Sequence, residues 1–115
     1  MSKNGVDKST INDFVGGTVY QAFLDPWCYH KWHSPVSGRI VASYIVGGAY
    51  FLQNPSLIDL TGDEPNYINS QPFLSSTAVR QIYLIEADNK KIGRIFLIMI
   101  GMVEISGCHS WVKPG

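Results

Sequence analysis

The residues best able to do chemistry lie in one short stretch, 28-CYHKWHSPVSG-38. It places His30 and His33 three positions apart and closes with a proline and a glycine. Imidazole changes charge near neutral pH and also binds transition metals, so the histidines could act as general acid and base or form a metal site. A third interpretation is structural, in which both rings are polar groups bonded to backbone partners beside a core.

A metal site is the least favoured of these interpretations. Pro35 disfavours helical geometry at the residue before it, and the neighbouring aromatic residues favour an extended chain. On a strand, side chains three positions apart point to opposite faces, so the two imidazoles would not share an ion. A third ligand would have to be Cys28, Cys108 or His109, none of which stands at a spacing typical of metal sites. We therefore predict no metal ligands.

The opposite orientation of the two rings suits the catalytic interpretation, because each histidine could then serve a different step. Cys108 and His109 are a weaker candidate pair, since adjacent residues on a strand also face opposite sides. The aromatic residues Trp27, Tyr29 and Trp32 are expected to form core or pocket walls.

The composition limits the kinds of protein that could carry these residues. The chain has 115 residues, enough for one small domain, and its nine basic and nine acidic residues cancel. A neutral chain gives no electrostatic argument for a nucleic-acid partner. Charged residues make up only 16%, where about a quarter is usual, which suggests extensive burial or a surface covered by more protein. The two cysteines lie far apart, and we expect free, buried thiols.

The sequence predicts a mainly β fold, with no helix of convincing period. Runs rich in β-branched and aromatic residues predict strands, and clusters of Pro, Asn, Asp and Gly predict turns and loops. The expected strands are 18–24, 39–46, 79–87 and 94–105, the expected loop is 53–72, and a turn at 88–93 makes a hairpin of the last two strands. The apolar run 95–103 is too short to cross a membrane, so no transmembrane span is expected. We predict an incomplete antiparallel β-sandwich or barrel-like domain with long loops and little helix.

Four collinear blocks carry a resemblance to a known family. The stretch 29-YHKWHSPVSG-38 resembles the YHxxHSPVxG signature of phosphatidylserine decarboxylases and of their fungal relatives, including tryptophan decarboxylases. The blocks 16–24, 76–93 and 101–115 look like the flanking segments of the fungal, tryptophan-decarboxylase-like branch. The first twelve residues are polar and lack an apolar core, so a disordered or irregular segment is expected over residues 1–12. The resemblance implies a partial domain of this family over residues 13–115.

The resemblance implies pyruvoyl chemistry. Members of the family cut themselves before a serine, which becomes a covalent pyruvoyl group and removes carbon dioxide from an amino-acid substrate through a Schiff base. Phosphatidylserine would give phosphatidylethanolamine, and a tryptophan-like amino acid would give its amine. By the family pattern His33 is the base of the self-cleavage triad, and His30 takes part in the decarboxylation.

The chain also departs from the family pattern. It contains no Gly-Ser-Thr or Gly-Ser-Ser sequence, so no pyruvoyl group is expected to form from its own residues. Asp7, Asp13 and Asp25 stand too near the signature to match the family's triad aspartate. We therefore expect the chain alone to be inactive: either a fragment, which we favour, or a non-catalytic subunit that pairs with a full-length homologue or with a missing C-terminal piece. No basic amphipathic stretch marks a membrane surface, so a cytoplasmic location is favoured and a peripheral membrane location stays open.

Overall fold

The computed structural model describes residues 6–24, 28–50, 70–101, 107 and 109–115. These residues form two compact units. The first unit contains the described residues of Met1–Tyr44, Tyr83–Leu97 and Val112–Gly115. The second contains those of Ile45–Ile82 and Ile98–Trp111.

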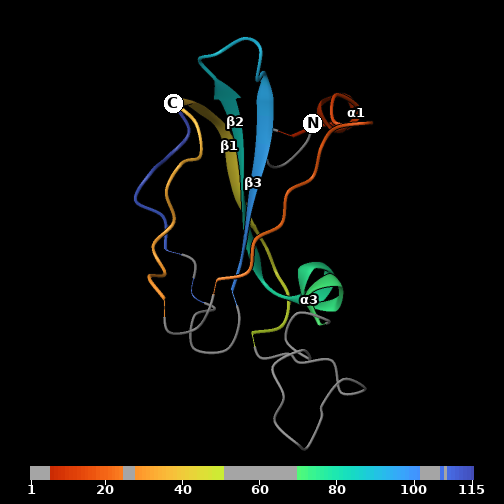
Figure 1. The fold of residues 1–115 in the computed structure, drawn as a ribbon, viewed down its shortest axis with the longest axis vertical. Helices are drawn as coiled ribbons and strands as arrows, with labels where there is room; N and C mark the ends of the chain where they lie inside the picture. The colour runs from red at the N-terminus through yellow and green to blue at the C-terminus, as the bar shows by residue number, and fades with distance from the viewer. Residues whose placement is uncertain (1–5, 25–27, 51–69, 102–106, 108) are drawn as a thin grey trace, which may run out of the picture. The chain divides into compact units, whose positions relative to one another are not determined.

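The main element is an open three-stranded sheet with the order β1-β2-β3 (Figure 1). Its strands are β1 (Gly38–Val46), β2 (Arg80–Ala87) and β3 (Arg94–Ile100). The predicted class is confirmed: the sheet is mainly antiparallel, helix is scarce, and the described strands do not close into a barrel. Each of these three strands is a run rich in β-branched and aromatic residues. Each begins at the expected residue or one residue away from it. Of the predicted strand 94–105, residues 102–106 lie outside the described residues.

The central strand β2 carries most of the core. Its residues are buried almost continuously, and it is the strand with a described neighbour on each side. In the first unit its most buried side chain is Leu84, with 1% of its surface exposed. The edge strands β1 and β3 are less buried, because each has only one neighbour among the described strands.

The hairpin between β2 and β3 closes through the predicted turn at 88–93. The side-chain oxygen of Asn89 accepts a hydrogen bond from the Lys91 amide at 3.0 Å, and its carbonyl accepts one from Ile92 at 3.0 Å. Gly93 adopts a φ of 71°, a conformation that favours glycine. The Ala87 amide then donates to the Gly93 carbonyl at 2.9 Å, which closes the loop.

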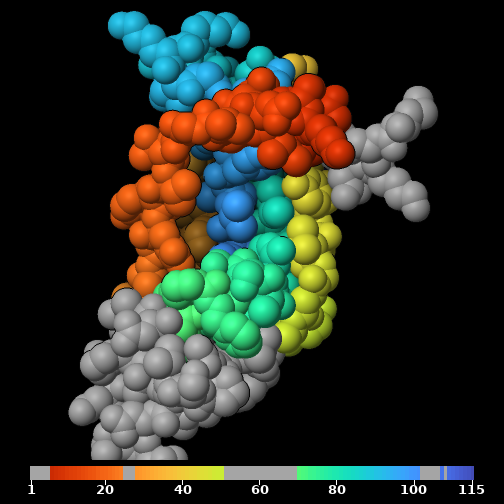
Figure 2. Space-filling model, turned by 90° about the vertical axis from the view of Figure 1, so that its right-hand side faces the viewer, coloured from red at the N-terminus to blue at the C-terminus, as the bar shows by residue number. Residues whose placement is uncertain are grey.

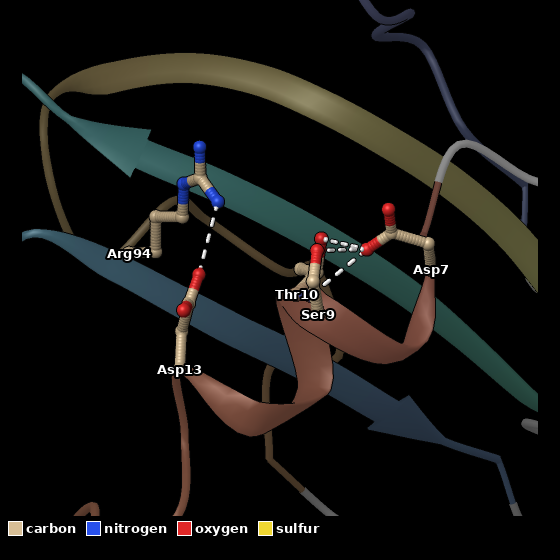
Figure 3. A network of polar contacts seen from close by, with 5 residues as sticks. All are labelled: Asp7, Ser9, Thr10, Asp13 and Arg94. Carbon is tan, nitrogen blue, oxygen red and sulfur yellow. Dashed lines mark hydrogen bonds and ion pairs between the residues drawn. The ribbon is translucent and has the colours of Figure 1, made fainter.

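Two short helices were not expected from the sequence. Helix α1 (Lys8–Asn12) lies in the segment predicted to be irregular. It is capped by Asp7, whose carboxylate accepts hydrogen bonds from the Thr10 amide at 2.9 Å and the Ser9 hydroxyl at 2.7 Å. These bonds, led by that of the Thr10 amide, lower the pKa of Asp7 to about 2 (Figure 3).

Helix α3 (Gln71–Thr77) begins at the end of the predicted loop 53–72, of which residues 53–69 lie outside the described residues. Pro72 stands in its first turn, where the missing amide hydrogen costs nothing. At its other end the Arg80 guanidinium donates to the carbonyls of Ser76 at 3.3 Å and Ala78 at 3.0 Å. No described helix is long and apolar enough to span a membrane.

The predicted strand over 18–24 is wrong. These residues have no regular structure, and Val19 and Tyr20 are 91% and 89% exposed. Strand propensity acts through packing against a neighbouring strand, and no described strand pairs with this segment. The segment follows the N-terminal residues that are coloured red in Figure 2. Those residues contact β3 through Phe14, whose ring centroid lies 4.3 Å from that of Phe96.

Candidate active-site loop

The signature residues form an irregular loop that leads directly into β1. Residues 29–34 have no regular secondary structure, and the chain bends at 35–37 before the strand begins. The Ser34 hydroxyl donates a hydrogen bond to the Val36 carbonyl at 2.6 Å, across Pro35. The extended strand on which we placed the histidines is therefore absent, and the argument from opposite strand faces does not apply.

The end of the loop is fixed to the central strand by close backbone contacts. The Asp88 amide donates to the Ser37 carbonyl at 3.0 Å. A Cβ atom at Gly38 would clash with the carbonyl oxygen of Glu86 and would lie 2.9 Å from the Cα of Ala87. Only glycine allows this approach, which gives a structural reason for the glycine that ends the signature.

A cross-strand ion pair stands beside this junction. Arg39 donates from Nη2 to the Glu86 carboxylate at 3.0 Å, and this hydrogen bond lowers the pKa of Glu86. The pair is solvent-exposed, so it helps to align β1 with β2 more than it adds to stability.

His33 contacts Tyr29 within the loop. The Tyr29 hydroxyl lies 2.9 Å from His33 Nε2, and the two rings stack with centroids 5.7 Å apart and an interplanar angle of 10°. Both residues are exposed to solvent, Tyr29 by 61%. Tyr29 was expected to be a core or pocket wall; it is 61% exposed and so is not a core wall, and a pocket role stays a prediction.

His30 differs from His33 in its surroundings, because it is half-buried whereas His33 is exposed. The two histidines therefore differ in how far each is exposed to solvent. Among the described residues no three His, Cys, Asp or Glu side chains come close enough together to hold a metal ion.

The remaining candidate residues lie elsewhere or are exposed. Cys28 is a free thiol and is exposed, so the expectation of a buried thiol is wrong for this residue. Trp32 is 51% exposed and so is not a core wall. His109 makes an edge-to-face contact with Trp111 at 5.1 Å. Cys108 and Trp27 lie outside the described residues.

Comparison with known proteins identifies the class of this loop. The family model described as phosphatidylserine decarboxylase matches residues 3–115. The chain is 49% identical over 107 residues to an L-tryptophan decarboxylase of Psilocybe cubensis, covering 89% of this chain and 24% of that protein. It is 41% identical over 117 residues to the decarboxylase iboD of Amanita muscaria, covering 95% and 33%. A phosphatidylserine decarboxylase proenzyme of Coxiella burnetii is 26% identical over 106 residues, covering 92% and 33%.

The chain belongs to the phosphatidylserine decarboxylase family, as its signature loop predicted. The relatives described above are named as decarboxylases. The chain spans only about a quarter to a third of the length of the relatives described above.

Proposed function

We propose that this chain supplies the histidine loop of a pyruvoyl-dependent decarboxylase that acts on an amino acid. The observation that carries the proposal is the contact of His33 Nε2 with the Tyr29 hydroxyl at 2.9 Å, in a loop that is exposed to solvent. A general base must lie within hydrogen-bond reach of the proton it removes, and the loop holds this nitrogen where a hydroxyl can approach it.

The two histidines take different roles in this proposal. His33 accepts the proton of a serine hydroxyl during self-cleavage, so its exposure lets that serine reach it from another segment of polypeptide. His30 orients or protonates the substrate during decarboxylation, and its half-buried position suits a residue that lines a pocket.

The pyruvoyl group supplies a carbonyl that withdraws electrons from the bond that breaks when carbon dioxide leaves. The chain's residues fit the formation of this group in one respect, because the exposed His33 offers a base to a hydroxyl. The 115 residues contain no Gly-Ser-Thr or Gly-Ser-Ser sequence, so the serine must come from polypeptide outside them.

A free aromatic amino acid is the favoured substrate. The relatives named L-tryptophan decarboxylase share 49% of aligned residues with this chain, against 26% for the Coxiella phosphatidylserine decarboxylase proenzyme. Phosphatidylserine is the alternative within the same family.

The test completes the chain with the N-terminal segment and the serine-bearing C-terminal segment of a related decarboxylase, fused at its two ends or co-expressed, so that the triad aspartate and the serine are both supplied. Self-cleavage is followed by mass spectrometry, and amine formation is measured with tryptophan and with phosphatidylserine in vesicles. His33→Gln should lower the cleavage rate by at least about a hundredfold, the lower limit for loss of a general base. His30→Gln should leave cleavage intact and lower turnover, and Lys31→Gln, an exposed neighbour, should change neither. Cleavage at an unchanged rate in His33→Gln would disprove the proposed role.

A second candidate function is a non-catalytic subunit of a full-length decarboxylase. It is favoured by the strands β1 and β3, each with one described neighbour, since such edges can pair with another polypeptide. Co-purification with a full-length relative, without cleavage or amine formation by the completed chain, would select this function.

A further inference from the structure

We infer that Tyr29 is a positioning residue for His33: its hydroxyl donates a hydrogen bond to Nε2 and so holds the imidazole with its proton on Nδ1. The observation is the 2.9 Å distance from the Tyr29 hydroxyl to Nε2, combined with rings that are parallel to within 10°. This inference rests on the proposed function of His33 and extends it to a residue outside the histidine pair.

The direction of the hydrogen bond follows from the chemistry of the two groups. A neutral imidazole has one N–H donor and one nitrogen acceptor, and the partner of one nitrogen decides where the proton resides. The phenol O–H is the more acidic donor and the unprotonated imidazole nitrogen is the stronger acceptor. The O–H···N arrangement is therefore favoured, which makes Nε2 the acceptor.

The stacking of the two rings restrains the orientation of the His33 imidazole. A hydrogen bond alone, between two exposed side chains, would leave that orientation free. The ring centroids lie 5.7 Å apart, within the range of favourable contacts between aromatic rings. Tyr29 and His33 stand four positions apart, and the Ser34–Val36 hydrogen bond restrains the chain just after the histidine. The stacking contact therefore fixes the plane of the imidazole, and the Tyr29 hydroxyl fixes the position of Nε2.

This arrangement prepares His33 for its proposed step. A base that removes a serine proton needs an unprotonated nitrogen already directed at a hydroxyl. The Tyr29 hydroxyl keeps Nε2 in that form, and an incoming serine hydroxyl can replace it as the donor on the same nitrogen. Tyr29 therefore acts through His33 and need not touch the substrate.

The test reads the tautomer of His33 directly in the 115-residue chain. Two-dimensional ¹H–¹⁵N spectra that correlate ring nitrogens with ring protons, recorded with the imidazole rings neutral, distinguish a protonated from an unprotonated nitrogen. In the unmodified chain Nε2 should appear as the acceptor and Nδ1 as the protonated nitrogen. In Tyr29→Phe, which keeps the ring and removes the hydroxyl, the ratio of the two tautomers should move toward protonated Nε2 by about threefold, the lower range for a net hydrogen bond.

The matched control is Tyr20→Phe, which removes the hydroxyl of a tyrosine that is 89% exposed in the same unit. It should leave the His33 signals unchanged. Protonated Nε2 in the unmodified chain, or the same tautomer ratio in Tyr29→Phe, would overturn the inference.

Self-cleavage of the completed chain gives a separate measurement. If Tyr29→Phe shifts the tautomer and slows cleavage, the positioning role is supported together with the base role of His33. If the tautomer shifts and even His33→Gln cleaves normally, the contact stands and the proposed base role fails. If the tautomer shifts and cleavage slows only in His33→Gln, Tyr29 does not position the base and the inference is overturned.

Discussion

The carboxylate of Asp13 lies 3.2 Å from the guanidinium of Arg94, although the two residues stand 81 positions apart in the chain (Figure 3). The next residue, Phe14, places its ring centroid 4.3 Å from that of Phe96 on β3. The ion pair is solvent-exposed, whereas both rings are half-buried. The ring contact, more than the ion pair, therefore holds the residues after α1 against the hairpin.

Replacing Phe14 should destabilise the fold more than breaking the ion pair. Phe14→Ala removes apolar contact and an aromatic pair, and we expect a loss of about 1–2 kcal/mol in the free energy of unfolding. Asp13→Asn removes only an exposed ion pair and should cost about 0.5 kcal/mol or less. Urea denaturation of both variants compares them, and equal losses would contradict this order.

The N-cap of α1 should depend on pH. The pKa of Asp7 is about 2 in the folded chain, below its ordinary value of 3.8, because its carboxylate accepts hydrogen bonds from Thr10 and Ser9. A depressed pKa means that the cap contributes fully above pH 3.8 and is lost as the pH falls through about 2. NMR titration of the Asp7 carboxyl and of the Thr10 amide measures both events together. The control is Asp7→Asn, which keeps a hydrogen-bond acceptor at the cap but has no carboxyl group, so the Thr10 amide should not show this transition. A pKa of 3.8 for Asp7 in the folded chain would refute the cap.

A methyl group at Gly38 should disturb the junction between the signature loop and β1. Gly38→Ala forces the new Cβ against the backbone of Glu86 and Ala87, and we expect a loss of about 1–3 kcal/mol. Gly47→Ala is the matched control, since a Cβ there meets nothing within 4 Å, and it should change stability by about 0.5 kcal/mol or less. Thermal melts compare the stabilities of the two variants. A melting temperature of Gly38→Ala equal to that of the unmodified chain would contradict the prediction.

The centre of the sheet should be the most sensitive part of the core. Leu84→Ala leaves a cavity at a side chain that is 1% exposed on β2, and we expect a loss of about 2–5 kcal/mol. Ile98→Ala, at a residue 47% exposed on β3, should cost about 1 kcal/mol or less. Denaturant midpoints at a constant m-value give the comparison. Similar losses in the two variants would show that β2 is not the better-packed strand.

The sequence by itself determined the three strands, their hairpin turn and the family. Strand segments and turns follow from residues close together in the chain, such as the β-branched run of β2 or the Asn89 and Gly93 positions that only certain residues satisfy. The signature loop identified the family because its residues stand at a distinctive spacing. The roles of His30 and His33 stay predictions.

Only the tertiary structure showed the features that depend on contacts between residues far apart in the sequence. Residues 18–24 have strand composition without a described strand partner, and helices α1 and α3 are too short to show a helical period. The exposure of Cys28 and the contact of Tyr29 with His33 depend on how an irregular loop bends before β1. The Asp13–Arg94 and Phe14–Phe96 contacts need the chain to close over more than eighty residues, so nothing in the neighbourhood of either residue could reveal them.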